Sequence, residues 1–271
     1  MEEDQEARPV RIIIPTKGRR NNQLTLRNLP KDLQLVTTVV CPYKEAVYIK
    51  EDFPHVEVVR QPEEIQTIAE KRKWIVDGAT DDKIVMLDDD LRFAVRREDN
   101  PGLFRQAAPH DILKAFAELQ NLLGPETPHA GFAVRGSGIG DAAKRGGWQT
   151  TGKRMMYSLG YHVPTVKAHA IFGRINTRED MDITLQLLLK GFPNAVNFSF
   201  VTDQAAFKPG GCSEERTVEK SNLDALKLAE FFPNYVRVSE KDYKASVPRL
   251  EVVVQWQQAL NDGIRIKSAK A

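Results

Sequence analysis

Three adjacent aspartates, Asp88, Asp89 and Asp90, are the residues whose type and spacing most clearly indicate chemistry. Carboxylates this close together repel one another unless a cation neutralises them. Mn²⁺ and Mg²⁺ bind such oxygens and commonly keep water and substrate phosphates as further ligands. In an extended segment Asp88 and Asp90 share one side, one for a ribose and one for a metal, and Asp89 faces away and matters least. The alternative is a solvated acidic turn, but the preceding apolar strand favours a metal site.

A second acidic group, Glu179, Asp180 and Asp182, lies at the start of a predicted helix over residues 177–190. Thr177 and Asp180 have the spacing of a capping box, and acidic residues suit the positive end of a helix. Three carboxylates in four residues exceed what capping needs. We therefore predict that Asp180 is a general base that accepts a proton from an acceptor hydroxyl, with Glu179 and Asp182 as the next candidates.

Arg72 is unusual because it falls on the apolar stripe of a predicted helix over residues 64–79, seven residues after Ile65 and seven before Ala79. Buried arginine is rare unless it is paired. We predict that Arg72 points to a nucleotide or diphosphate, or braces the acidic cluster. The alternatives are a side chain that snorkels along the helix edge and a functional role for the neighbouring Lys71.

The elements that position these residues alternate between strand and helix patterns. Short apolar runs predict strands at residues 10–15, 35–41, 56–60 and 83–87. Such β-α-β order is typical of an α/β protein with a parallel sheet. Ligands of these sheets bind beyond the carboxyl ends of the strands. The loop at residues 16–20 and the acids after Leu87 are therefore expected to face one site.

The second half of the chain is less regular. Helices are predicted at residues 111–123, 177–190 and 223–232, and the Gly-rich, basic segment 131–160 is expected to form loops or short strands over a site. Basic residues that flank an aromatic suit phosphate contacts and base stacking in DNA. The candidate DNA-binding residues are Lys144, Arg145, Trp148, Lys153 and Arg154. The alternative is a solvated surface that carries charges of both signs.

Composition places the chain among ordinary globular proteins. It has 271 residues, 41% of them hydrophobic, and a net charge of +2, which by itself does not indicate a nucleic-acid-binding protein. We expect one domain with a nucleotide-sugar half (9–90), an acceptor and catalytic half (91–215) and a C-terminal helical extension (216–271). Its oligomeric state stays open.

Several protein classes are disfavoured by what the sequence lacks. Cys41 and Cys212 are the two cysteines, too few for a disulfide framework or a cysteine-rich zinc site. Neither a membrane-spanning apolar run nor a secretory signal is present, which leads us to expect a cytoplasmic protein, in the host cytoplasm if a phage encodes it. Phosphate-binding P-loop and dinucleotide-binding motifs are also absent.

Over roughly residues 10 to 215, with the β-α-β order described above, the chain resembles the GT-A type glycosyltransferases. The resemblance rests on IIIPTKGR in the first strand and loop, the Arg72 helix, LDDD and the RED-MD segment. It implies a GT-A-like α/β fold with a mixed, mainly parallel central sheet flanked by helices. It also implies that the acids hold Mn²⁺ or Mg²⁺ through Asp90 and Asp88, and that Asp180 is the base of an inverting enzyme. The implied contacts with the nucleotide sugar are Pro15, Thr16, Arg19, Arg72, Asp88 and Asp89.

A narrower resemblance rests on LDDDLRF, REDMDITLQLLLKGFPN and KPGGCSEER. These segments are similar to the glycosyltransferases associated with TET/JBP-type DNA oxygenases, whose phage members are thought to glucosylate hydroxymethylated bases. The likeness implies that Gly210 and Gly211 close over the sugar diphosphate. No histidine follows His169, so phosphates and water are expected to complete the metal shell.

The expected reaction is the transfer of a hexose, with glucose from UDP-glucose as the first candidate, to a hydroxymethylated pyrimidine, 5-hydroxymethylcytosine, in DNA, with the target base flipped out of the duplex. Three alternatives stay open: a glycan, lipid or protein acceptor; a sugar nucleotidyltransferase; and a DNA-binding module with an inactive transferase fold. The intact acids at 88–90 and 179–182 argue against the last. The sugar and the anomeric outcome are left undetermined.

Overall fold

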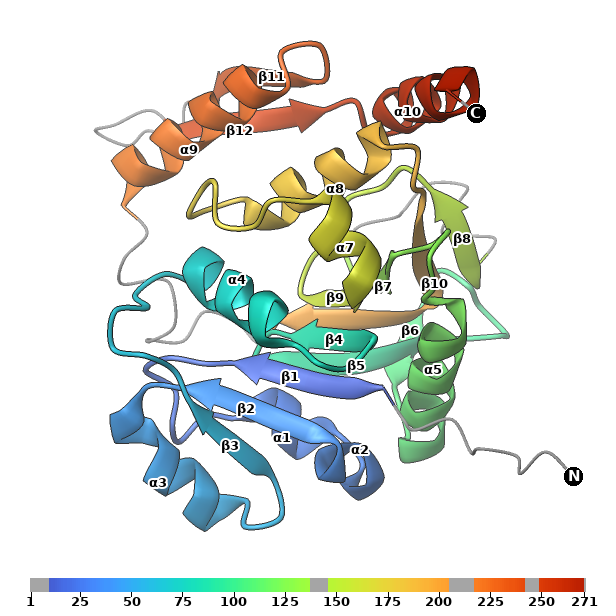
Figure 1. The fold of residues 1–271 in the computed structure, drawn as a ribbon. Coiled ribbons are helices and arrows are strands. Elements are labelled where there is room, and N and C mark those ends of the chain that lie inside the picture. The colour runs from blue at the N-terminus through green and yellow to red at the C-terminus, as the bar shows by residue number, and fades with distance from the viewer. Residues whose placement is uncertain (1–9, 137–145, 205–216, 242–248, 271) are drawn as a thin grey trace, which may run out of the picture.

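A computed structural model describes residues 10–136, 146–204, 217–241 and 249–270 (Figure 1). In chain order the elements are β1 (Arg11–Pro15), α1 (Leu24–Asn28), α2 (Lys31–Leu35), β2 (Thr37–Cys41), α3 (Tyr43–Asp52), β3 (Glu57–Arg60), α4 (Ile68–Gly78), β4 (Lys83–Leu87), β5 (Leu91–Arg96), β6 (Phe104–Gln106), α5 (Pro109–Leu122), β7 (His129–Val134), β8 (Trp148–Thr151), β9 (Ser158–His162), α7 (Val163–His169), α8 (Glu179–Leu189), β10 (Asn194–Gln204), α9 (Val218–Phe231), β11 (Val236–Lys241), β12 (Arg249–Val254) and α10 (Trp256–Lys270).

One large mixed sheet organises the protein. Its strand order is β3-β2-β1-β4-β9-β7-β10-β5-β6, and β8 pairs with β10 outside this path. The pairings make β1, β2, β3, β4, β6, β7 and β10 run in one direction, whereas β5, β8 and β9 run in the other. The predicted α/β class with a mixed, mainly parallel sheet is therefore confirmed.

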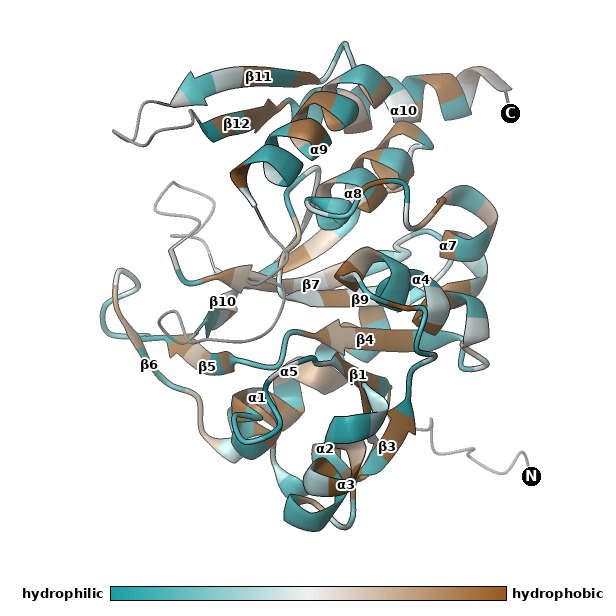
Figure 2. Cartoon of the chain, turned by 90° about the vertical axis from the view of Figure 1, so that its left-hand side faces the viewer, coloured by the Kyte–Doolittle hydropathy of each residue, from teal (hydrophilic) through white to brown (hydrophobic). Residues whose placement is uncertain are grey.

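Alternating apolar side chains build a core on each face of the sheet. Along β1, Ile12 and Ile14 pack in one core cluster and Ile13 packs in the other. The first cluster includes residues of α1, α2, α3 and α5, and the second includes residues of α4, α7 and α8. Figure 1 shows α1–α3 on one face and α4, α7 and α8 on the opposite face. Figure 2 shows the hydrophobic β4 between these layers, as expected for a strand buried on both faces.

The first half follows the predicted order, with small shifts at the element ends. The predicted helix over 64–79 begins only at Ile68, because the Thr67 side chain accepts from the Glu70 backbone N–H and the Glu70 carboxylate accepts from the Thr67 N–H. This capping box fixes the helix start. Short helices α1, α2 and α3 were not anticipated.

Two predictions for the second half need correction. Segment 131–160 does not simply cover the site, because β7 and β9, which overlap its two ends, are largely buried strands of the central sheet. The C-terminal extension is not wholly helical, because β11 and β12 form an antiparallel pair between α9 and α10. Within the described ranges, helices are all too short or too polar to cross a membrane.

Candidate active site

The acidic cluster lies where β4 ends and the chain turns into β5. The Asp88 N–H donates to the Tyr157 carbonyl at 2.9 Å. Thr25 of α1 fastens the turn, since its N–H donates to the Asp89 carbonyl at 3.0 Å and its hydroxyl donates to the Asp88 carbonyl. Because Asp89 and Asp90 form a turn, the expected alternation of an extended segment does not occur. Strand alternation is therefore not what relates the directions of Asp88 and Asp90.

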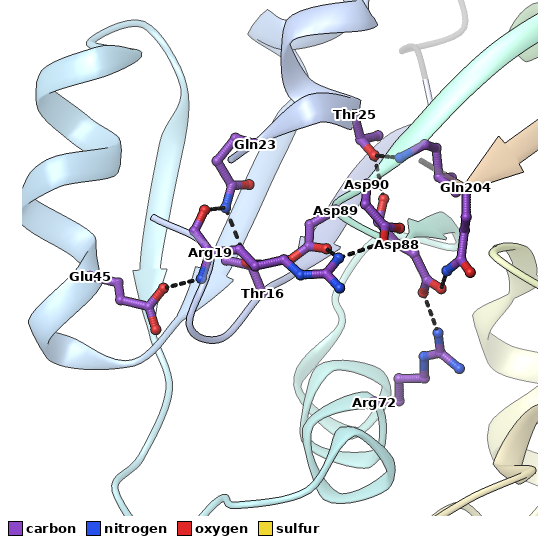
Figure 3. A network of polar contacts seen from close by, with 11 residues as sticks. Thr16, Arg19, Gln23, Thr25, Glu45, Arg72, Asp88, Asp89, Asp90 and Gln204 are labelled. Carbon is purple, nitrogen blue, oxygen red and sulfur yellow. Dashed lines mark hydrogen bonds and ion pairs between the residues drawn. The ribbon is translucent and has the colours of Figure 1, made fainter. Parts of the chain in front are cut away.

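Asp89 and Asp90 instead converge on Arg19. One guanidinium nitrogen, Nη1, lies 2.7 Å from Asp89 Oδ1 and 2.6 Å from Asp90 Oδ2 (Figure 3). Burial alone would lower the pKa of Arg19, but the two carboxylates outweigh burial and raise it. Burial raises the pKa of Asp89, opposed by its bonds from Thr16 and Arg19. Asp89 is thus held as firmly as its neighbours, contrary to the expectation that it faces away.

The first loop, residues 16–20, is hydrogen-bonded to this cluster. The Thr16 hydroxyl donates to Asp89 Oδ2, and Gln23 Nε2 donates to the Thr16 hydroxyl at 3.0 Å. Glu45 of α3 accepts from the backbone N–H groups of Gly18 and Arg19. Thr16 is only 2% exposed and Pro15 is buried. Thr16 links the loop to the acids, and the nucleotide contact of these two residues stays a prediction.

Arg72 joins the two acidic groups. Its side chain is 7% exposed, and its guanidinium donates to Asp88 Oδ1 at 2.8 Å and to Glu179 Oε1 at 2.5 Å. Burial would lower the pKa of Arg72, but Glu179 and Asp88 raise it. The interpretation that Arg72 braces the acidic cluster is confirmed, and snorkelling is wrong. Lys71 is also buried and donates to the Thr16 carbonyl at 2.7 Å.

The three acids of α8 point to different partners. Glu179 pairs with Arg72, whereas Asp180 Oδ2 lies 3.3 Å from the guanidinium of Arg154. Asp182 is 1% exposed and receives two hydrogen bonds from Arg174. Glu179 therefore reaches the acidic cluster through Arg72, and Asp180 lies near enough to help raise the pKa of the same arginine, while Asp182 is engaged elsewhere.

The predicted capping box at this helix does not form. Arg178 is the N-cap and makes no side-chain capping bond. The Thr177 hydroxyl donates instead to Asp224 Oδ2 at 2.9 Å. The acids at the start of α8 are consequently not explained by a capping-box bond to Thr177.

The donor atoms fit a divalent cation that a sugar diphosphate also binds. Asp90 Oδ1 is buried and has no hydrogen-bond partner among the residues that the structure describes, and a carboxylate oxygen is a ligand that such cations prefer. No group of three or more His, Cys, Asp or Glu in the described ranges is arranged to hold a metal by itself. Asp90 could therefore hold a cation together with substrate phosphates and water, and the assignment of Asp90 and Asp88 as metal ligands stays a prediction.

The predicted DNA-binding residues are divided by the structure. The Trp148 indole donates to Glu118 Oε2 at 2.8 Å, and its ring lies 6.0 Å from that of Phe132. Base stacking would require these contacts to be given up. Figure 1 shows β8 at the opposite end of the sheet from the arrowheads of β1 and β2. Lys153 and Arg154 are exposed, and Arg154 adjoins Asp180. The remaining predicted residues, Lys144, Arg145, Gly210 and Gly211, lie outside the described residues.

Three site residues carried no clear signal in the sequence. Gln204, at the end of β10, donates to Asp88 Oδ2 at 3.2 Å. Tyr157 has a positive φ of 65° and supplies the carbonyl that orients Asp88. Glu45 orients the first loop, as described above. Only the positive φ marks Tyr157 as unusual, and that is visible in the structure alone.

Comparison with known proteins gives one family and one fold. The model of the TET-associated glycosyltransferase family matches residues 10–210. The chain is 24% identical over 245 residues to the beta-glucosyl-HMC-alpha-glucosyl-transferase of Enterobacteria phage T2, covering 84% of this chain and 83% of that protein. The phage T6 protein of the same name is also 24% identical, over 244 residues, with the same shares covered.

Solved structures support the same fold. Glucosyl-3-phosphoglycerate synthase from Mycobacterium tuberculosis, solved with Mn²⁺, UDP and phosphoglyceric acid, superposes with a TM-score of 0.53 at 10% identity, over 92% of this chain and 87% of that one. S. aureus TarS superposes with a TM-score of 0.50 at 14% identity over 80% of this chain. The chain spans 64% of that TarS structure.

Proposed function

Because the chain belongs to the TET-associated glycosyltransferase family, we propose that it transfers glucose from UDP-glucose to a hydroxymethylated pyrimidine, 5-hydroxymethylcytosine, in DNA. The name of the phage relatives supports an HMC acceptor and a glucosyl group. The neighbour solved with Mn²⁺ and UDP supports a divalent cation and a UDP-linked donor for this fold. A glycan, lipid or protein acceptor is the alternative that the experiment below separates.

The observation that carries this proposal is the buried bridge through Arg72. A single guanidinium contacts Asp88 of the donor-side cluster and Glu179 at the start of α8. The bridge fixes the distance between the two acidic groups, because a paired buried arginine loses its partners if either group moves. Transfer requires a donor and an acceptor hydroxyl in one fixed arrangement.

In the proposed reaction Asp180 accepts the proton of the acceptor hydroxyl as its oxygen attacks the anomeric carbon and the bond to the diphosphate breaks. Arg154 lies 3.3 Å from Asp180 and orients its carboxylate. Arg19, drawn to Asp89 and Asp90, brings a positive charge to the side where the diphosphate leaves. A divalent cation at Asp90 and Asp88 would offset the charge that develops on that leaving group.

The name of the phage relatives favours a second form of the reaction. It specifies an acceptor that already carries a glucose and a product of alpha configuration. If the donor is an α-linked sugar nucleotide, an alpha product means retention. Asp180 would then orient the acceptor hydroxyl while the leaving phosphate takes the proton. The anomeric coupling constant of the transferred glucose in a proton NMR spectrum distinguishes the two forms.

The test uses the full chain with UDP-glucose and Mn²⁺ on three DNA substrates: unmodified, hydroxymethylcytosine-containing and glucosyl-hydroxymethylcytosine-containing. DNA is digested to nucleosides and analysed by mass spectrometry. One added hexose on the hydroxymethylated nucleoside supports the main proposal. A second hexose on the glucosylated nucleoside supports the second form of the reaction, in which the acceptor already carries a glucose. UDP release that is independent of the DNA used would contradict a DNA acceptor.

Asp180→Asn and Asp182→Asn are matched variants for this assay. Both remove one charge from α8, but Asp180 acts electrostatically on Arg72 and pairs with Arg154, whereas Asp182 pairs with Arg174. The proposal expects transfer to fall roughly a hundredfold in Asp180→Asn with UDP binding preserved. Equal transfer by both variants would remove Asp180 from the mechanism.

A further inference from the structure

The residue before α8 has an unfavourable backbone conformation that contacts with other elements must stabilise. Arg178, the residue before the helix, has φ 65° and ψ 22° in the left-handed region. A residue with a side chain persists there only where surrounding contacts hold it. The next two residues are Glu179 and Asp180, so a change at Arg178 would move both carboxylates.

The support for Arg178 comes from the C-terminal extension. Its Nη1 donates to the Ser221 carbonyl at 2.6 Å and to the Ser221 hydroxyl at 3.0 Å. Its Nη2 donates to the Leu250 carbonyl at 3.1 Å. Asn222 Oδ1 accepts from the Leu250 N–H at 2.9 Å. One arginine side chain is thereby fastened to α9 and to β12, which are themselves joined.

The preceding residue is fastened to the same helix by a buried carboxylate. Asp224 Oδ2 accepts from the Thr177 backbone N–H at 2.8 Å and from its hydroxyl at 2.9 Å. Asp224 is 4% exposed and Thr177 is 8% exposed. A hydrogen bond to a carboxylate that is shielded from water is strong, and its loss leaves a buried donor unsatisfied.

Packing extends the attachment along α8. Met181, Leu185 and Leu188 form a third core cluster with residues of α9, β11 and α10. Arg174, which holds Asp182, lies over Phe231 at 4.3 Å. Figures 1 and 2 show α9, β11 and β12 on the side of α8 that faces away from the large sheet. The match to the family model ends at residue 210, before this extension begins.

We propose that the described residues of the extension, 217–241 and 249–270, are a positioning module for the acceptor-side carboxylates, with Asp224 and Ser221 as its positioning residues. They act on Glu179 and Asp180 by fixing Thr177 and Arg178. The catalytic part of this inference rests on the proposed glucosyl transfer, whereas the fixing of the helix start does not.

The experiment compares Asp224→Ala with Asp262→Ala in the full chain. Asp262 also lies in the extension, where its side chain accepts hydrogen bonds from Tyr235 and Arg265. Hydrogen exchange of peptides over 174–184 measures the helix start, and steady-state transfer to hydroxymethylcytosine DNA measures its consequence. Asp224→Ala should speed exchange in these peptides about tenfold through local opening. It should lower kcat about tenfold while the KM for UDP-glucose changes less than about twofold.

Asp224→Asn should recover most of both effects, because its amide oxygen still accepts from Thr177. Asp262→Ala should leave exchange over 174–184 and kcat at wild-type values. Equal changes in the two alanine variants, or an unchanged kcat in Asp224→Ala, would overturn the positioning role. A wild-type chain that transfers nothing would refute the proposed function alone, because the exchange comparison still decides whether the extension fixes the helix start.

Discussion

Both acidic groups of the site hold three carboxylates within a short stretch of chain, but a turn carries one group and a helix carries the other. In the turn, Asp89 and Asp90 converge on Arg19 and Asp88 faces Arg72. In the helix, successive side chains rotate about 100°, and the acids separate toward Arg72, Arg154 and Arg174.

Neighbouring carboxylates therefore have different uses when a turn carries them and when a helix carries them. Convergent carboxylates concentrate negative charge at one point, which suits a cation and a diphosphate. Dispersed carboxylates each take a separate partner, so one can serve chemistry while another holds the fold. Single substitutions that compare one carboxylate of a group with another test this distinction.

The largest effect is expected from Asp90→Asn. This change removes a hard ligand oxygen, so the charge on the leaving diphosphate would be less well offset, and transfer should fall roughly a thousandfold, or about 4 kcal/mol. Calorimetric titration with Mn²⁺ in the presence of UDP should show weakened binding. Asp89→Asn is the matched control, because its oxygens are used by Thr16 and Arg19. Wild-type activity in Asp90→Asn would refute a cation site at this turn.

Arg72→Met should have the largest effect on stability. It leaves Asp88 and Glu179 without their shared buried partner, which typically costs about 3–5 kcal/mol. Urea unfolding at neutral pH measures the loss. Because a wholly apolar replacement is often tolerated, Arg72→Met combined with Glu179→Leu should be less destabilised than the sum of the single variants. Additive losses would show that the bridge does not couple the two groups.

Asp180→Asn should reduce transfer by roughly a hundredfold if a general base is lost, while Asp182→Asn should mainly lower stability. The two variants belong to one helix and remove the same charge, so their comparison isolates the direction in which each side chain points. Transfer rates at saturating UDP-glucose and thermal melting temperatures provide the two readouts. A variant Asp182→Asn that loses transfer without losing stability would contradict the dispersed arrangement.

A buried histidine, His129, should make the stability of the protein fall in acid. His129 is 1% exposed, and burial lowers its pKa from 6.5 to about 4. Between these values the unfolded chain binds a proton that the folded protein does not, so stability falls as the pH falls. From pH 6 to 4.5 the loss from this group is about 2 kcal/mol. Urea unfolding of His129→Gln across this range should show a shallower pH dependence than wild type, and parallel curves would exclude His129 as the source.

Much of the fold was predictable because its first half obeys simple periodicities. Strands buried on both faces are continuous apolar runs, and Arg72 was found because a charge on an apolar stripe requires a partner. β10 was missed because polar residues such as Asn194 and Asn197 interrupt its apolar pattern, although both are buried.

The site was only partly predictable for a different reason. The acids were found by residue type, but their directions depend on a turn that Thr25 fastens from α1. Gln204, Glu45 and Asp224 reach their partners through tertiary folding across distant parts of the chain. Periodicity describes one element at a time, so it contains no information about such contacts.

The smallest effect is expected outside both acidic groups, at Lys153. It is exposed and adjacent to Arg154, which pairs with Asp180, so a DNA strand that reaches the acceptor site would pass close to it. A single phosphate contact changes the slope of log K against log salt by about 0.9. Fluorescence anisotropy with hydroxymethylcytosine DNA at several salt concentrations should therefore give a slope shallower by about that amount in Lys153→Gln. Lys190→Gln, an equally exposed change at the far end of α8, should leave the slope unchanged. Identical slopes in both variants would place the DNA on another face and leave the acids of α8 to be reached from a different direction.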